Sequence, residues 1–301
     1  MSRVSLDELP AAPNLPSLST SRARRIFFSA PVRIVLGVLA IGLTAALGYA
    51  AIKAIAPLPA QRLVWPHLLM SALLLLVYVG FVKAMERRPL TELARGGAPA
   101  EFGVGVWLGA GAVSAAMALL AASGGYRIVA FHPWTVGIAS ALAEMLFVGL
   151  FEEILFRALI FRIVERSLGS VPALLLSAVL FALAHLGEGI NALGLVNTAL
   201  AGLMFSAAWM LTRRLWLCVG IHAAWNFTLG SIFSIVVSGH PAKGLIGGEL
   251  SGPDWLTGGA YGLEASVVTA LVIGALFMGL FWRARAAGQV LPARWGQRAI
   301  Q

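Results

Sequence analysis

Three short segments place polar side chains, at helical spacing, inside otherwise apolar sequence. They are FEEILFR with Glu152, Glu153 and Arg157, FALAH with Phe181 and His185, and HAAWN with His222 and Asn226. A charged side chain at the centre of a bilayer is disfavoured by about 2.5–3.5 kcal/mol on insertion scales, so such residues usually face a bundle interior and serve a function. These side chains are therefore the candidates for a functional site.

Helix geometry separates the two adjacent glutamates. Glu153 and Arg157 are four residues apart, so they lie on nearly the same face of a helix, where their charges can neutralise each other. Glu152 is rotated from Glu153 by about 100° and is less well placed to reach Arg157. We therefore predict that Glu153 and Arg157 support the structure and that Glu152 is the free carboxylate.

The histidines come from two other predicted helices. His222 and Asn226 are four residues apart and point from one face toward a common point, and Phe181 places a ring one turn before His185. At a rise of about 1.5 Å per residue, Glu152, His185 and His222 lie at depths that let them converge in the cytoplasmic half or the middle of the bilayer. The sequence thus predicts one shared polar cavity.

Such a group of side chains suits peptide hydrolysis by water. A carboxylate next to a histidine can act as a general base on water. His222 and Asn226 could donate hydrogen bonds to the oxyanion that forms when water attacks an amide carbonyl. No GxSxG motif is present, and Cys218, the one cysteine, lies in an apolar run with no nearby partner, so it is expected to be a buried packing thiol.

The elements that must position these residues are membrane helices. The 301 residues are 59% hydrophobic and 12% charged. Continuous apolar runs without the alternation of barrel strands predict an all-α polytopic helical bundle. About eight spans are expected, at 32–52, 64–84, 103–122, 134–161, 171–187, 190–211, 215–237 and 262–282.

The distribution of lysine and arginine predicts the orientation. These residues are concentrated in the tails and in alternate connections, which places both termini in the cytoplasm. The net charge of +9 follows from these short connections rather than from one basic face, so we expect membrane lipid, and no nucleic acid, as a partner. The predicted organisation is a disordered cytoplasmic tail at 1–30, N-terminal helices at 31–130, a catalytic core at 131–240, and an extracytoplasmic loop, last helix and cytoplasmic tail at 241–301.

Two glycine patterns bear on how the helices pack. Gly105 and Gly109 match the small-xxx-small pattern of close helix contacts, and Gly220 would let another backbone approach the helix of His222. Glu144 lies in the outer half of the fourth predicted span and belongs to no motif. Asn197 and Thr198 are expected to be packing polar groups.

The ordered motifs EExxxR, FxxxH and HxxxN resemble those of the CPBP intramembrane proteases, the CAAX prenyl endopeptidase and bacteriocin-processing (Abi) family. The resemblance covers about residues 136–238; one small departure is Ala158, where many members have glycine. It implies that Glu152 and His185 activate water and that His222 and Asn226 hold the oxyanion. Glu153, Arg157 and Phe181 would then be supporting residues.

Whether a metal takes part is left open by the sequence. HExxH is absent, yet two histidines and a glutamate could supply the three protein ligands of a catalytic zinc, and proteins of this family are often labelled metalloproteases. If zinc is bound, its ligands would be His185, His222 and Glu152. We expect no tightly bound metal.

The sequence therefore predicts an intramembrane endopeptidase in the inner (plasma) membrane of a bacterium. Its substrate would be a prenylated C-terminus, a leader peptide or a membrane-protein segment. Two other functions fit the same residues. One is a proton-coupled transporter that uses the buried carboxylates and histidines as a relay. The other is a catalytically inert scaffold or immunity protein on the same fold.

Overall fold

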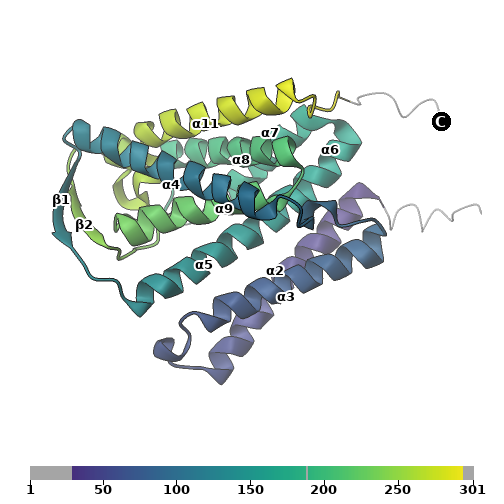
Figure 1. The fold of residues 1–301 in the computed structure, drawn as a ribbon, viewed down its shortest axis with the longest axis horizontal. Helices are drawn as coiled ribbons and strands as arrows, with labels where there is room; N and C mark the ends of the chain where they lie inside the picture. Colours follow the sequence, from purple (N-terminus) through teal and green to yellow (C-terminus); the bar gives the residue numbers. More distant parts are fainter. Residues whose placement is uncertain (1–28, 188, 294–301) are drawn as a thin grey trace, which may run out of the picture.

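A computed structural model describes residues 29–187 and 189–293 of the chain. Long helices lie side by side in one bundle, with a small two-stranded sheet at one end (Figure 1). The predicted fold class, an all-α bundle of membrane helices, is confirmed. The disordered tail predicted for 1–30 lies outside the described residues except at its end, where Ala30 begins the first helix.

The helices before the predicted core are α2 (Ala30–Ile55), α3 (Trp65–Phe81) and α4 (Ala98–Ala122). The hairpin of α2 and α3 packs on one flank of the bundle, against α5 (Val136–Glu153), whereas α4 lies on the other side of α9 (Leu215–Phe227) (Figure 1). The core therefore has helices from the first third of the chain on both sides.

The core and C-terminal helices follow in chain order. α5 continues through the π-helical segment η5 (Ile154–Phe161) into α6 (Arg162–Leu168). After them come α7 (Ser170–Ala184), α8 (Ala192–Thr212), α9 with the π-helical turn η6 (Thr228–Ile232), the short α10 (Asp254–Thr257), and α11 (Val267–Ala286).

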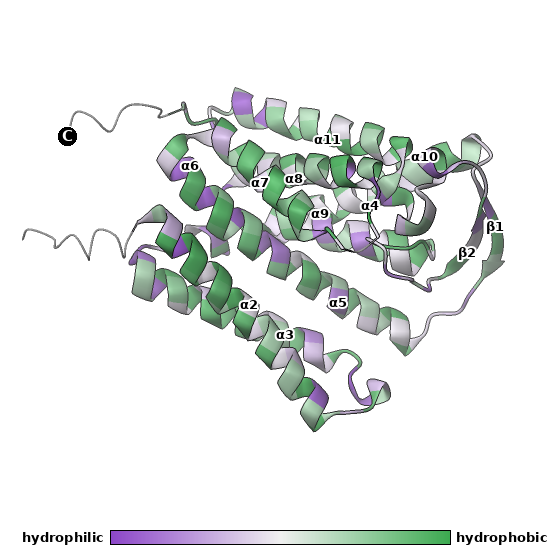
Figure 2. Cartoon of the chain, turned by 180° about the vertical axis from the view of Figure 1, so that it is seen from behind, coloured by the Kyte–Doolittle hydropathy of each residue, from purple (hydrophilic) through white to green (hydrophobic). Residues whose placement is uncertain are grey.

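Six helices of the described chain are long and apolar enough to cross a membrane: Ala30–Ile55, Trp65–Glu86, Ala98–Ala122, Ala192–Thr212, Leu215–Ile232 and Val267–Ala286. Hydrophobic residues cover most of their length, and hydrophilic residues lie mainly toward the helix ends (Figure 2). The other two predicted spans are also helical, but Ser170–Ala184 is shorter and Val136–Glu153 contains three glutamates. The count of eight crossings therefore stays a prediction.

Both ends of the described chain lie at the same end of the bundle (Figure 1). That arrangement agrees with placing the two termini on one side of the membrane. The cytoplasmic assignment of that side rests on the positive-inside rule and stays a prediction.

The described residues include two strands that the apolar runs do not predict. β1 (Tyr126–Phe131) follows α4 and pairs antiparallel with β2 (Ile246–Leu250), which lies in the loop before α11; the register shifts between Ile128 and Ala130. The last helix is also displaced from its predicted range of 262–282, because it begins at Val267, where the Ser266 side chain accepts a hydrogen bond from the Thr269 N–H.

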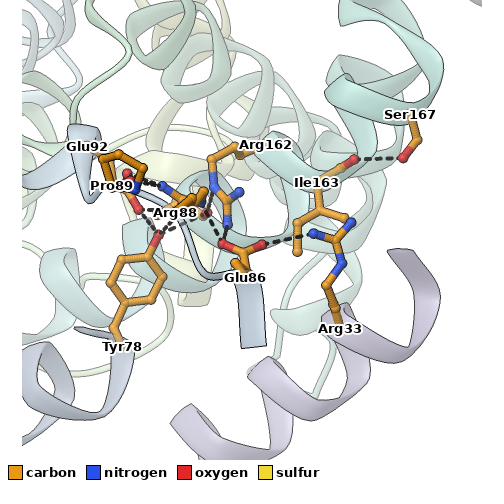
Figure 3. Close-up of polar contacts among 10 residues, drawn as sticks. Arg33, Tyr78, Glu86, Arg88, Pro89, Glu92, Arg162, Ile163 and Ser167 are labelled. Atoms are coloured by element: carbon orange, nitrogen blue, oxygen red, sulfur yellow. Dashed lines mark hydrogen bonds and ion pairs between the residues drawn. The ribbon is translucent and has the colours of Figure 1, made fainter. Parts of the chain in front are cut away.

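A buried ionic cluster joins the α2–α3 hairpin to the core helix at the end where α6 lies (Figure 3). The Glu86 side chain is 1% exposed and accepts hydrogen bonds from Arg162 at 2.6 Å, Arg88 at 2.8 Å and Arg33 at 3.4 Å. Glu92, which is fully buried, accepts two hydrogen bonds from Arg88 and one from the Tyr78 hydroxyl. Removing one partner of such a cluster leaves buried charge uncompensated.

The Glu92 carboxylate gives the first prediction. Burial raises its pKa, but the hydrogen bonds from Arg88 and Tyr78 lower it further, so the pKa lies below the ordinary value of 4.5. Ionised Glu92 therefore contributes stability above that ordinary value, and the contribution is lost as the pH falls through the folded-state pKa. We expect Glu92→Gln to lower the thermal unfolding temperature at neutral pH and to reduce the loss of stability on acidification, measured in detergent from about pH 7 to about pH 3.

Glu249→Gln is the matched control, because the Glu249 side chain is 59% exposed and its ion pair crosses the β1–β2 sheet to Arg127. An acid profile of Glu92→Gln that superimposes on the wild-type profile would contradict this role for Glu92.

Candidate active site

The charged segment of the fourth predicted span lies where the helix changes form. α5 ends at Glu153 and continues directly into the π-helical η5. π-Helical turns are rare and often occur at functional sites. Glu153 and Arg157 are both fully buried, and Arg157 Nη1 donates to Glu153 Oε1 at 3.2 Å. The predicted ion pair between these two residues is present.

Arg157 also connects this helix to its neighbours. Its Nη2 atom donates to the backbone oxygen of Gly202 on α8 at 3.2 Å. Its guanidinium carbon lies 4.5 Å from the ring centroid of Phe181 on α7 and 4.9 Å from that of Phe205 on α8, which is cation–π geometry. Phe181, a predicted supporting residue, thus contacts Arg157 directly.

His222 makes a contact that helical spacing does not predict. Its Nδ1 atom lies 2.8 Å from Glu153 Oε1, and because a carboxylate can only accept, Nδ1 is the donor. His222 Nε2 lies 3.9 Å from Glu152 Oε2. Helical spacing alone predicts that Glu153 pairs with Arg157, but Glu153 also binds His222. Because α9 crosses α5 at this level, the two adjacent glutamates face the two nitrogens of the His222 imidazole.

Stacking further fixes the His222 ring. The Phe205 ring lies against it, with centroids 4.7 Å apart and an interplanar angle of 20°. With the hydrogen bond to Glu153, this contact sets both the rotation and the tilt of the imidazole. Phe205 belongs to no motif, and only the packing of α8 on α9 reveals its role.

His185 is fixed by its own helix. It stands at the C-terminal cap of α7, and its Nδ1 atom lies 2.8 Å from the backbone oxygen of Phe181, one turn earlier. Because a carbonyl only accepts, Nδ1 carries a proton, and in the neutral imidazole Nε2 is then the acceptor. The FxxxH spacing thus determines which nitrogen of His185 is available for proton transfer.

Three of the four predicted catalytic residues line one cavity. They are His185, His222 and Asn226, and the cavity is about 40 Å³ in volume, enough for a small number of water molecules. Glu152 is not part of this lining, although its Oε2 atom lies 3.9 Å from Nε2 of His222, which is. Its Oε2 atom is buried and has no hydrogen-bond partner among the described residues.

The same cavity contains residues that the motifs did not identify. They are chiefly Asn197, Trp225, Ser238 and Glu264. Asn197, expected to be a packing group, donates to the backbone oxygens of Glu264 and Ser266, each at 2.8 Å. Glu264 belongs to no motif, and the predicted last span, 262–282, includes it; the Ser266 cap two residues later is the one signal that separates it from that helix.

The candidate zinc ligands are not arranged as a ligand set. Within the described residues, no three His, Cys, Asp or Glu side chains are grouped so that they could hold a metal ion. His222 Nδ1 is bonded to Glu153, and His185 Nδ1 to the Phe181 carbonyl. These hydrogen bonds would leave Nε2 of each histidine for a metal, so the misfit comes from the missing third ligand: Glu152 does not line the cavity that His185 and His222 share, and the three side chains do not form a ligand set.

Comparison with known proteins agrees with the three motifs. Residues 133–228 match the family model described as type II CAAX prenyl endopeptidase Rce1-like. This segment is an Rce1-like domain. The predicted resemblance to the CAAX prenyl endopeptidases is confirmed, and the domain is of the CAAX intramembrane protease class. No curated protein and no solved structure matches the chain.

The Rce1-like domain runs from just before α5 into the first residue of η6, so it contains all three motifs. With the apolar helices it identifies an integral membrane protein. Cys218, inside the domain, is fully buried, as predicted, and its sulfur lies 3.4 Å from the Phe205 backbone oxygen.

Close packing against α4, which lies outside the Rce1-like domain, sets the position of α9. A Cβ atom at Gly105 would lie 2.5 Å from the backbone oxygen of Leu217, and one at Gly109 would collide with that of Ile221. From the other side, a Cβ atom at Gly220 would collide with the Phe102 backbone oxygen. The three glycines predicted to permit close helix contact therefore meet in one crossing, beside His222.

The crossing gives the second prediction. Gly109→Ala is expected to destabilise the protein by about 1–3 kcal/mol, the range for an overpacked core, because α4 and α9 must separate. Thermal unfolding in detergent measures this change. Gly111→Ala is the matched control on the same helix, because a Cβ atom there meets nothing within 4 Å. Equal stability of the two variants would contradict the proposed crossing constraint.

Proposed function

We propose that this protein is an intramembrane endopeptidase in which Glu152 and His185 activate water and His222 and Asn226 stabilise the oxyanion. The observation that carries the proposal is the cavity shared by His185, His222 and Asn226, with Glu152 Oε2 3.9 Å from His222 Nε2. The match of residues 133–228 to an Rce1-like endopeptidase supports the reaction class.

Glu152 is suited to be the base because its Oε2 atom accepts no hydrogen bond from the described residues and its side chain, unlike that of Glu153, is partly exposed. A buried acceptor without a partner is unfavourable, so a water molecule or a substrate group is favoured at Glu152 Oε2. Glu152 would take a proton from the attacking water, and His185 Nε2, free as an acceptor, would share or relay it to the departing amine. No side chain needs to form a covalent intermediate.

The oxyanion would be held from α9. His222 is fixed at Nδ1 by Glu153, which leaves Nε2, when protonated, to donate to the oxyanion, and Asn226 donates from one turn further along. Arg157 balances the Glu153 charge in this arrangement. Glu153, Arg157 and Phe181 are accordingly proposed as supporting residues, which hold His222 without touching the substrate.

The proposed substrate is a peptide whose scissile bond reaches the membrane interior. The matched family is described as a prenyl endopeptidase, so an isoprenylated peptide ending in a CAAX sequence is the first probe. Leader peptides and membrane-protein segments are the other proposed substrates. Mass spectrometry of protein termini, comparing cells that contain wild-type protein with cells that contain Glu152→Gln, covers all three classes.

The central prediction concerns Glu152. With purified protein in lipid nanodiscs, Glu152→Gln and His185→Ala are each expected to lower kcat by about 10²–10⁴-fold, the usual contribution of general acid–base catalysis. Glu144→Gln is the matched control, because Glu144 is an exposed carboxylate on the same helix. Wild-type rates in a folded Glu152→Gln variant would exclude the proposed mechanism.

A separate prediction tests the oxyanion side. Asn226→Ala is expected to lower kcat by about 10²–10³-fold with little change in KM, because its hydrogen bond would form mainly in the transition state. Steady-state kinetics on the same peptide give both constants. A variant that raises KM and leaves kcat unchanged would instead assign Asn226 to substrate binding.

A further inference from the structure

Glu264 brings a carboxylate to the catalytic cavity from outside the Rce1-like domain. It lies in η8 (Leu263–Ala265), a single 3₁₀ turn immediately before α11. Of the described residues that line the cavity with His185 and His222, Glu264 alone carries a carboxylate. The family match ends at residue 228, so neither the motifs nor the match assigns it a role.

Both carboxylate oxygens of Glu264 are engaged. Oε1 accepts from the indole Nε1 of Trp225 at 3.1 Å. Oε2 accepts from the backbone N–H of Ser238 and from its hydroxyl, the latter at 3.2 Å. The backbone oxygen of Glu264 accepts from Asn197 on α8. One residue therefore ties α8, α9 and the loop after η6 to the start of α11.

The contact to Trp225 bears directly on the proposed oxyanion residues. Trp225 is buried and lies three residues after His222 and immediately before Asn226. Because the three residues share one helix, fixing the indole fixes the rotation of α9 at the level of the cavity. The opposing constraint on α9 is its crossing with α4.

The contact to Ser238 has a second physical consequence. Ser238 has a φ of 45°, in the left-handed region that a non-glycine residue rarely occupies. Such a conformation persists only where surrounding contacts enforce it. The Glu264 carboxylate provides such a contact, because it accepts from both donors of Ser238, and it thereby holds the loop against the cavity.

We propose that Glu264 is a positioning residue, which holds His222 and Asn226 in place through Trp225 and closes the cavity with the Ser238 loop. We call the contacts of Glu264 with Trp225 and Ser238 the Glu264 clamp. Its effect on catalysis rests on the proposed function, but the existence of the clamp does not. Burial raises the pKa of Glu264, and the hydrogen bonds from Ser238 and Trp225 oppose that rise. The clamp depends on the two acceptor oxygens of the Glu264 side chain rather than on its negative charge.

The first test measures exchange, which needs no activity. Hydrogen–deuterium exchange of full-length protein in nanodiscs is expected to be faster in peptides covering 222–240 when Glu264 is changed to Gln or Ala, because Ser238 N–H and the end of α9 lose their anchor. Gln keeps one acceptor oxygen, so its effect should be smaller than that of Ala. Glu249→Gln, an exposed carboxylate of the loop before α11, should leave this region unchanged.

The second test measures kinetics on the isoprenylated peptide. Glu264→Gln is expected to lower kcat about tenfold or more, with KM within about twofold, because a small misplacement of groups that act in the transition state lowers kcat. Trp225→Phe removes the indole N–H and keeps the ring. If Glu264 acts through Trp225, adding Glu264→Gln to Trp225→Phe should lower kcat far less than it does alone.

The outcomes separate the two proposals. Unchanged exchange in 222–240 overturns the clamp, whether or not the protein cleaves the peptide. Faster exchange with wild-type kcat, or fully multiplicative effects of the two substitutions, overturns the positioning role. If wild-type protein cleaves no substrate class, the proposed function fails while the exchange result still decides the clamp.

Discussion

The buried contact between Glu153 and Arg157 is the constraint on which the rest of the core depends. Both side chains are fully enclosed. Removing charges from water is unfavourable unless their remaining donors and acceptors are satisfied, so the pair requires contacts from every helix around it. The Gly202 carbonyl, the rings of Phe181 and Phe205, and His222 Nδ1 supply several of these contacts, while Glu153 Oε2 and Arg157 Nε have no hydrogen-bond partner among the described residues. α7, α8 and α9 are thereby organised around one point.

The same constraint explains why Glu152 and Glu153 differ. Helical spacing in the sequence correctly paired Glu153 with Arg157, because residues four apart share a face. It could not show that His222 also binds Glu153, since that contact depends on how α9 crosses α5. The π-helical turn at Ile154–Phe161 was equally hidden, because no residue pattern distinguishes it from a continuing α-helix. Local periodicity therefore predicts the pair of Glu153 and Arg157 but not the third member, His222, which comes from another helix.

The parts of the fold that could be predicted from the sequence are those that local sequence signals determine. Apolar runs located α2 and α8 to within about three residues, since the hydrocarbon thickness sets the length of a span. The last helix was placed several residues too early. Gly258, Gly259 and Gly262 have positive φ, and together with the Ser266 cap they form short turns there. The Ser266 capping signal could have corrected the boundary and placed Glu264 outside the helix.

The site is more widely distributed in the chain than its motifs. All three motifs fall within residues 133–228, yet α9 is held on one side by the glycines of α4 and on another by Glu264. A close crossing of backbones restricts translation of a helix, whereas an indole fixed at its N–H restricts rotation. Catalysis by fixed hydrogen-bond donors requires both restrictions, because donors act on the transition state only when they are already in place. The helices outside the matched domain thus supply the rigidity that the motif residues cannot supply themselves.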